Sequence, residues 1–231
     1  MTLAVLLPLL LAAGPAPVPV YFEQTTVVLA DGKPSGPGVT ARIWYSGARM
    51  RMEPGNAPAG TALVLRLDQG KAYRMDPARK RAIAIDLQRL RDQSQMDVAM
   101  AGQLMGVDAG GVKTEALPQP RVIGGYRCSG YRLSAGSTVL DVYLTRKIPA
   151  DVSAFTDFLE WSGASQAMGG LVAALRALPG FPLEMRSHVN VMGEMHETLS
   201  TIAGVKVGPH AAALFAPPAG WKVEAESSWE E

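Results

Sequence analysis

The sequence predicts an α+β fold in which one large antiparallel sheet is combined with helical segments. Short stretches of alternating apolar and polar residues, joined by Gly- and Pro-containing turns, recur along most of the chain and are typical of antiparallel strands. Two other stretches, 88–105 and 151–178, repeat their apolar residues at helical spacing. The chain has 231 residues, 48% of them hydrophobic, so it can bury a substantial core.

Residues 1–19 are predicted to be a signal peptide followed by the Pro-rich start of the mature chain. Leu3–Ala13 is an apolar run of eleven residues that ends in small residues, although no Lys or Arg precedes it. This run is too short to cross the apolar layer of a bilayer, which is about 30 Å thick. No other apolar run approaches that length, so we expect an exported, periplasmic protein that is not an integral membrane protein.

The mature chain is expected to begin with a strand at 20–29 and to continue with a hairpin turning at Ser46-Gly47. This turn pairs Ile43 with Met50, and both then lie on an apolar face. The opposite face is expected to be cationic and solvated, and it carries Arg42, Trp44, Arg49 and Arg51.

Three more strands, at 61–67, 71–75 and 81–87, are predicted to form a meander. Each alternates, and tight turns containing Gly or Pro join them. Leu65 and Ile85 fall on the apolar face of this meander.

The period then changes to helical over 88–105, where Met100 lies on or beside the apolar stripe. Methionine fills irregular gaps because its side chain is flexible. Its presence here is compatible with ordinary core packing and also with an adaptable surface for an apolar ligand.

A hairpin from Gly124 to Thr145 is predicted to be the central strand pair of the sheet, after a short edge strand at 112–116. Ala135-Gly136-Ser137 is expected to be its three-residue turn, because glycine supplies the positive φ that such loops need. Leu140, Val142 and Leu144 share one face of its second strand.

The second helical segment, 151–178, places Phe155, Leu171 and Leu175 in one apolar stripe. Glycines interrupt it, so two helices or one bent helix are expected. Such a helix on a sheet serves as a lid or as a plain part of the core, and the pattern leaves both interpretations open.

The last hairpin is predicted to pair 181–191 with 195–202 around Gly193-Glu194. Residues 205–218 are expected to be irregular, with a turn of helix at 211–215. The domain boundaries follow: a single domain spans 20–223, and 224–231 form a flexible acidic tail.

Composition and motifs limit the possible functions. Lys and Arg total 22, Asp and Glu total 21, and the net charge of +1 argues against a nucleic-acid partner. No G-x-S-x-G, H-E-x-x-H or phosphate-loop motif occurs, so we expect no enzyme activity and no cofactor. Cys128 is the only cysteine and is expected to be a buried apolar residue.

A group of methionines and histidines in the last hairpin suggests a Cu(I) site, because soft thioethers and imidazoles suit that ion. The predicted pairing weakens this hypothesis, because His196 then points away from Met192 and Met195. The residues in question are Met185, His188, Met192, Met195 and His196.

Several short motifs are spread along the chain. They are Gly125-Tyr126-Arg127-Cys128 with Tyr131, Trp44-Tyr45-Ser46-Gly47, Arg49-Met50-Arg51, Gly180-Phe181-Pro182-Leu183-Glu184, Leu214-Phe215 and Pro217-Pro218-Ala219-Gly220-Trp221. Together these motifs resemble an uncharacterised family of bacterial exported domains, which is similar to the periplasmic and outer-membrane lipoprotein carriers of the localisation-of-lipoproteins type. The resemblance covers about 21–221. It implies a strongly curved antiparallel sheet, an incomplete barrel, with helices covering a concave apolar face that shelters acyl chains in the carriers.

Three functions remain as hypotheses. The first is a non-enzymatic periplasmic protein that holds a lipid, an acyl chain or a lipoprotein in an apolar cavity between sheet and helices. The second is an envelope structural or protein-interaction module with a filled core, which uses the cationic strand face. The third is copper binding. The predicted cavity lining is Ile43, Met50, Leu65, Ile85, Met100, Phe155, Leu171 and Leu175.

Overall fold

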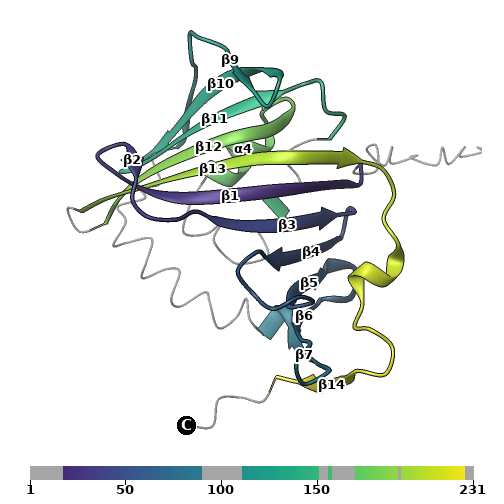
Figure 1. The fold of residues 1–231 in the computed structure, drawn as a ribbon. Helices are drawn as coiled ribbons and strands as arrows, with labels where there is room; N and C mark the ends of the chain where they lie inside the picture. The colour runs from purple at the N-terminus through teal and green to yellow at the C-terminus, as the bar shows by residue number, and fades with distance from the viewer. Residues whose placement is uncertain (1–17, 90–110, 151–155, 158–169, 192–193, 227–231) are drawn as a thin grey trace, which may run out of the picture.

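A computed structural model describes residues 18–89, 111–150, 156–157, 170–191 and 194–226. These residues build one curved, open sheet of fourteen strands, with few helices (Figure 1). The prediction of a large antiparallel sheet is therefore confirmed. The strands are β1 (Val20–Ala30), β2 (Lys33–Pro34), β3 (Val39–Tyr45), β4 (Arg49–Pro54), β5 (Ala62–Arg66), β6 (Lys71–Asp76), β7 (Arg81–Asp86), β8 (Lys113–Ala116), β9 (Arg121–Ile123), β10 (Tyr126–Ala135), β11 (Thr138–Thr145), β12 (Phe181–Val191), β13 (Glu194–Val207) and β14 (Lys222–Ala225).

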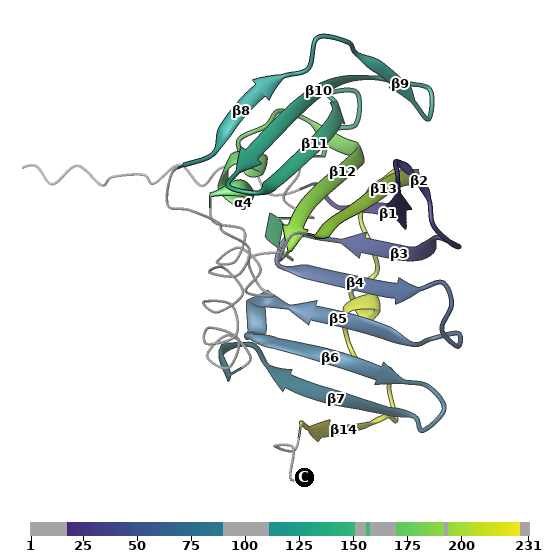
Figure 2. The same cartoon turned by 90° about the vertical axis from the view of Figure 1, so that its left-hand side faces the viewer.

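The order of strands across the sheet is β14-β7-β6-β5-β4-β3-β1-β13-β12-β11-β10-β8, with β2 beside β1 and β9 beside β10. The hairpin of β10 and β11 is not the central pair that its place in the sequence predicts, because in the described chain only the short strands β8 and β9, besides β11, pair with β10. The long strand β13 pairs with β12 on one side and with β1 on the other. This long-range pairing brings the N-terminal strand to the middle of the sheet, as Figure 2 shows from the side.

The hairpin of β3 and β4 turns one residue later than expected, because Gly47, with φ 59°, takes the first central position of a two-residue turn. Tyr45 therefore pairs with Met50, so the predicted partnership of Ile43 with Met50 is wrong. The shift of two residues in register leaves every side chain on its predicted face, because the side-chain period of a strand is two. Gly136, with φ 55°, likewise opens a two-residue turn between β10 and β11 instead of the predicted three-residue one.

The last hairpin is also shifted. Its register pairs Val191 with Glu194, so that His196 lies opposite Val189 and His188 lies opposite Glu197. The predicted turn at Gly193-Glu194 is therefore wrong, and β13 continues to Val207 rather than ending at Ile202. Met192 and Gly193 lie outside the described residues.

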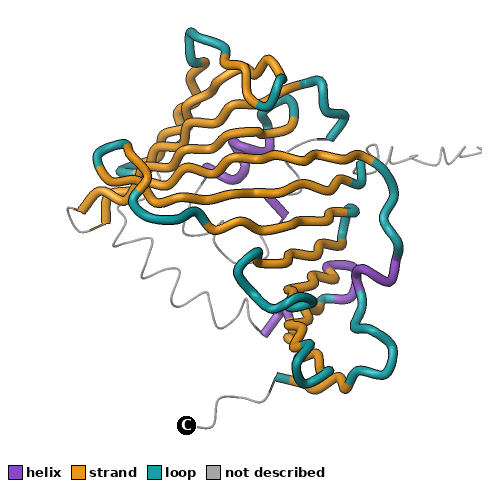
Figure 3. Tube along the Cα trace, viewed as in Figure 1, coloured by secondary structure: helices purple, strands orange, loops and turns teal. Residues whose placement is uncertain are grey.

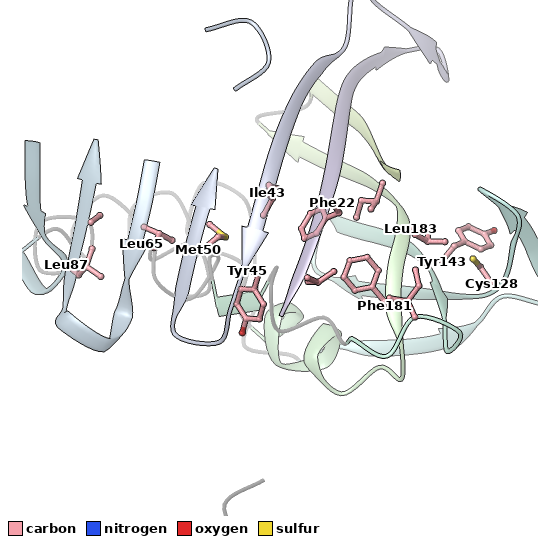
Figure 4. Close-up of a cluster of buried hydrophobic side chains, with 14 residues drawn as sticks. Phe22, Ile43, Tyr45, Met50, Leu65, Leu87, Cys128, Tyr143, Phe181 and Leu183 are labelled. Atoms are coloured by element: carbon pink, nitrogen blue, oxygen red, sulfur yellow. The ribbon is translucent and has the colours of Figure 1, made fainter. Parts of the chain in front are cut away.

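One face of the sheet, which we call the inner face, carries α4 (Leu171–Arg176). The side chains of Leu171 and Leu175 are buried in the cluster that contains Leu140 and Val142 of β11, and Val172 is buried as well. The apolar stripe predicted for this part of the chain is thus confirmed. Figure 4 shows a second group of inner-face side chains that continues across the strands, with Leu87, Leu65, Met50, Ile43, Phe22, Phe181 and Leu183 among them.

The opposite, outer face is crossed by residues 208–221, which we call the strap. The strap contains the 3₁₀ turn η2 (Ala212–Phe215) and runs from β13 to β14, passing behind β4 and β5 in the view of Figure 2. Figure 3 shows η2 as the short helical segment on this connection. β14 then pairs in parallel with β7, so the strand extends through Ala225 into the segment predicted to be a free tail.

The remaining helical predictions are only partly covered by the structure. Leu87, Gln88 and Arg89 are helical, and the Arg89 N–H donates to the Asp86 carboxylate at 3.0 Å, as a helix N-cap requires. The rest of 88–105 and most of 151–169 lie outside the described residues, as does the predicted signal peptide up to residue 17. Among the residues that are described, no helix is long and apolar enough to cross a bilayer.

Candidate functional site

A cavity of about 390 Å³ lies on the inner face between the middle strands and α4. This volume falls in the range of about 300–1,000 Å³ that is usual for small-molecule sites. Its described lining comes from β1, β3, β4, β11, β12, β13 and α4. The lining residues are Phe22, Gln24, Thr26, Val39, Ala41, Ile43, Met50, Met52, Leu140, Leu171, Val172, Leu175, Met185, Ser187, Thr198 and Ser200.

The strands present this lining because alternate residues of a strand point to the same face. On β1, Phe22, Gln24 and Thr26 point inward together, and on β3 the inward series is Val39, Ala41 and Ile43. The register places Phe22 opposite Ile43 and Thr26 opposite Val39, so neighbouring strands contribute matching rungs to one wall.

Exposure rises along each of these strands from one end of the cavity to the other. On β1 the inner side chains pass from Phe22, which is 0% exposed, through half-buried Gln24 and Thr26 to Val28, which is 58% exposed. On the antiparallel strand β3 the same gradient runs from Ile43 back to exposed Val39. The cavity therefore has a closed floor near Phe22 and a mouth near Val28.

The residues that line the cavity become more polar from the floor toward the mouth. Among the sixteen lining residues of the described chain, eleven are apolar and five are neutral polar residues, which we call the polar belt. Every member of the belt belongs to β1, β12 or β13 and is half-buried near the mouth, whereas the floor is apolar. The polar belt consists of Gln24, Thr26, Ser187, Thr198 and Ser200.

The members of the polar belt are hydrogen-bonded to one another across the strands. The hydroxyl oxygens of Thr26 and Ser200 are 2.8 Å apart, and those of Ser187 and Thr198 are 2.7 Å apart. The side-chain amide of Gln24 donates long hydrogen bonds of 3.4 Å to Thr26 and to Ser200. These contacts hold the belt in place at the level where β1, β13 and β12 lie side by side.

The described lining of the cavity contains no Asp, Glu, Lys, Arg or His. Most ionisable residues of β12 and β13 alternate onto the outer face, whereas Glu194 and His196 share the face of Thr198 but are exposed at the end of β13. Glu197 accepts a hydrogen bond from Arg186 at 2.9 Å and pairs with His188 at 3.0 Å. The hydrogen bond from Arg186, with a contribution from the charge of His188, lowers the pKa of Glu197.

A polar network lies between the end of β3 and α4, outside the described lining of the cavity. The hydroxyl of buried Tyr45 donates to Asp157 Oδ2 at 2.6 Å, and Arg176 of α4 donates to Asp157 Oδ1 at 2.6 Å. Arg176 also donates to the hydroxyl of fully buried Thr156 at about 3.0 Å. Asp157 thus links the end of α4 to β3, which holds the helix against the sheet.

Of the eight side chains predicted to line a ligand cavity, six lie within the described residues, and these six fall into two groups. Four of them, Ile43, Met50, Leu171 and Leu175, line the cavity. The other two described residues do not line it and instead belong to the inner-face core beside it, on strands β5 and β7. These two are Leu65 and Ile85, whereas Met100 and Phe155 lie outside the described residues.

The predicted lining contained none of the residues of β1, β12 and β13 that form the walls of the cavity. The alternation of Phe22, Gln24 and Thr26 with their neighbours was visible in the sequence. Ser200 and Thr198 carry no such signal, because a run of Ser and Thr fits an inner or an outer face equally well. Only the pairing of β13 with β1 places them on the inner face.

The prediction of a solvated cationic face is wrong for two of its four residues, Trp44 and Arg51. Trp44 packs against the apolar cluster beneath the strap, and the side chain of Arg51 is only 11% exposed. Arg51 donates to the Leu214 carbonyl at 3.2 Å, which ties it to the strap. The side chains of Arg42 and Arg49 are 48% and 40% exposed but form ion pairs, with Glu53 of β4 and with Asp68 in the turn after β5.

Cys128 is buried, as expected, and burial raises the pKa of its thiol. In the described ranges, His, Cys, Asp and Glu side chains form no group of three or more that could hold a metal ion. His188 lies against Glu197, and Met195 of the copper hypothesis is 56% exposed. Met192 lies outside the described residues.

Comparison with known proteins gives a family and several matching solved structures. Residues 40–221 match a family described as a domain of unknown function (DUF4412). No curated protein matches the sequence.

The solved structures that match this chain share little sequence with it. An uncharacterised conserved protein from Thermus thermophilus is 10% identical, with a TM-score of 0.46 and coverage of 90% of this chain and 91% of that one. A LolA superfamily protein from Nitrosomonas europaea is 8% identical, with a TM-score of 0.35 and coverage of 87% and 90%. PNGF-II is 11% identical, with a TM-score of 0.41; the match covers 91% of this chain but only 31% of PNGF-II.

Proposed function

The chain belongs to the DUF4412 family, and we propose that it is a non-enzymatic periplasmic protein that binds a lipid or an acyl chain in its inner-face cavity. The observation that supports the proposal is an uncharged, mostly apolar cavity of about 390 Å³ whose floor is built from fully buried side chains such as Phe22. Apolar groups that leave water for such a space gain about 25 cal/mol per Å² of buried surface.

In this proposal the helical segments around α4 cover the apolar face of the curved sheet and complete the site. Leu171, Val172 and Leu175 already supply one wall, and Met50, Met52 and Met185 supply flexible side chains that adapt to an irregular chain. A lipoprotein is a candidate cargo because its apolar part is also an acyl chain.

The filled-core alternative receives less support. It relied on a free cationic strand face, but Arg51 and Arg66 of that region donate to carbonyl oxygens of the strap. The outer face of β4 and β5 is therefore already occupied by the protein itself.

Cavity filling tests the proposal. Ala41→Phe adds a ring to the cavity wall, whereas Ala203→Phe adds the same ring at an exposed position of β13 outside the cavity. The uncharged fluorophore Nile red is expected to bind the natural protein and Ala203→Phe, and to lose at least about tenfold in affinity for Ala41→Phe, which corresponds to about 1.4 kcal/mol. Equal binding by all three proteins, or no binding by any, would overturn the proposal.

Native mass spectrometry of the mature protein purified from its own periplasm, followed by organic extraction, identifies the natural cargo. A bound lipid mass that is absent from Ala41→Phe is the expected result. A bare polypeptide mass, together with no Nile red binding, would point instead to a protein partner, which crosslinking would then detect.

A further inference from the structure

The polar belt places hydrogen-bonding groups at a defined depth in an otherwise apolar cavity. It begins with Gln24, the next inward residue after the floor residue Phe22, and reaches the exposed rim, where Thr26 pairs with Val39 and Thr198 pairs with Val28. A ligand that enters tail first would therefore bring its polar end to the belt.

Resting on the function proposed above, we propose that the ligand is an uncharged amphiphile: a single acyl chain joined through an ester to a head that carries hydroxyl groups, as in a monoacylglycerol. The acyl chain lies toward Phe22 and Ile43, and the ester and hydroxyl groups bond to the polar belt. A free fatty acid, which ends in a carboxylate, is the ligand that this site disfavours.

The hydrogen-bonding capacity of the belt matches such a head. A hydroxyl carries one donor and accepts as well, and a glutamine amide carries two N–H donors and a carbonyl acceptor. In each of the pairs Thr26–Ser200 and Ser187–Thr198, one hydroxyl donates and the accepting hydroxyl keeps its own proton for another partner. The belt therefore offers both donors and acceptors, which an ester carbonyl and a neighbouring hydroxyl use together.

The charge distribution excludes an ionic head from the same place. No cationic side chain is present in the described lining to neutralise a carboxylate at the belt. The ionisable residues next to the belt on β12 and β13, Arg186, His188 and Glu197, alternate onto the outer face and bond to one another. His196 shares the face of Thr198 but is exposed and is not part of the described lining. Burying a charge without a partner is far more costly than burying a hydrogen-bonded neutral group.

The chain offers a matched control for the belt. Thr25 follows Gln24 on β1 but points to the outer face, where its hydroxyl lies 2.9 Å from that of Thr40. Thr25→Val and Thr26→Val thus each remove one hydroxyl of a half-buried hydroxyl pair, from the same strand and from opposite faces of the sheet.

The experiment measures displacement of Nile red by monolauroyl glycerol and by dodecanoate at about pH 8, where the free acid is ionised. The natural protein and Thr25→Val are expected to bind the monoacylglycerol at least about tenfold more tightly than the acid. Thr26→Val is expected to lose most of that preference while it still binds Nile red. Ser200→Ala, which removes the other hydroxyl of the pair, gives a second measurement should Thr26→Val fold poorly.

The outcomes separate this inference from the proposed function. Equal or tighter binding of dodecanoate by the natural protein would overturn the inference and leave lipid binding standing. An unchanged preference in both Thr26→Val and Ser200→Ala would also overturn it. Failure of Nile red and of both lipids to bind would overturn the proposed function and the inference together.

Discussion

The cavity on the inner face and the cluster beneath the strap are two apolar regions of the same sheet that are completed in different ways. The outer cluster, formed by Ala62, Val64, Met75, Ala82 and Phe215, is filled by side chains of the protein itself. The inner region keeps about 390 Å³ of space beside walls that are mostly apolar.

The two regions also differ in the charge and the bonding of the polar groups around them. Beneath the strap, Arg51 and Arg66 donate to the carbonyl oxygens of Leu214 and Phe215, so charged side chains fasten one part of the protein to another. Around the cavity, the polar groups are neutral, half-buried and bonded to one another across the strands. This contrast indicates that the outer cluster serves stability and supports the proposal that the inner cavity serves binding.

The largest effect is expected from Phe215→Ala in the outer cluster. Phe215 is 2% exposed, and its removal leaves a void under the strap that the sheet cannot close. Truncation of a buried phenylalanine lowers the free energy of unfolding by about 3–5 kcal/mol, which urea unfolding measures. A loss below about 1 kcal/mol would mean that the strap is not part of the core.

A matched pair of methionines compares the two regions directly. Met75 is 2% exposed in the outer cluster, whereas Met185 is half-buried at the cavity wall. Met75→Ala is expected to cost about 2–5 kcal/mol, and Met185→Ala about 2 kcal/mol less, because its side chain already borders open space. Equal losses in urea unfolding would show that the cavity wall is packed as tightly as the outer cluster.

A smaller effect is expected from Tyr45→Phe at the end of β3, beside α4. The substitution keeps the ring, which is 2% exposed, and removes only the hydroxyl that donates to Asp157. Loss of this hydrogen bond to a charged group is expected to lower the free energy of unfolding by about 1–3 kcal/mol. Since Asp157 also holds Arg176 of α4, proteolysis within α4 should become faster.

Asp157→Asn gives the complementary measurement. It keeps the size of the side chain but removes the charge that both Tyr45 and Arg176 contact. Protection of α4 from proteolysis equal to that of the natural protein in both variants would contradict a role of this network in holding the helix.

The strands and their faces could be predicted from the sequence, since local alternation decides both. Leu63 and Leu65 share the inner face and Tyr73 and Met75 share the outer one, as the pattern predicts. The register of the hairpin at Gly47 could not be predicted, because a shift of two residues leaves every side chain on the same face of the sheet.

The cavity itself depends on long-range pairing. Gln24 and Thr26 of β1 contact Ser200 of β13, which is more than 170 residues away along the chain. No local pattern reports such a pairing. The sequence did not predict that the strap covers the outer face, for a related reason. Leu214 and Phe215 form one short turn, and the pattern of the arginines beneath it is that of solvated residues until the turn is placed over them.

The smallest effect is expected from the pH dependence of the ion pair that supports the outer face. Asp68 accepts hydrogen bonds from Arg66 at 2.7 and 2.9 Å and from Arg49 at 3.0 Å, and the bond from Arg66 is the main reason that the pKa of Asp68 is lowered. Because the folded-state pKa lies below the unfolded value, about 3.9, this contribution is complete above that pH and is lost as the pH falls through the folded-state pKa.

Asp68→Asn should therefore lower the free energy of unfolding by about 0.5–1 kcal/mol at about pH 7, a small value because the Asp68 side chain is 27% exposed. The difference from the natural protein should shrink as the pH is lowered below about 3.9. Asp31→Asn, in the exposed turn between β1 and β2, is the control and should change little. A difference that stays constant down to low pH would mean that Asp68 acts through the shape of its turn, and Arg66 would then reach the Phe215 carbonyl without help from the carboxylate.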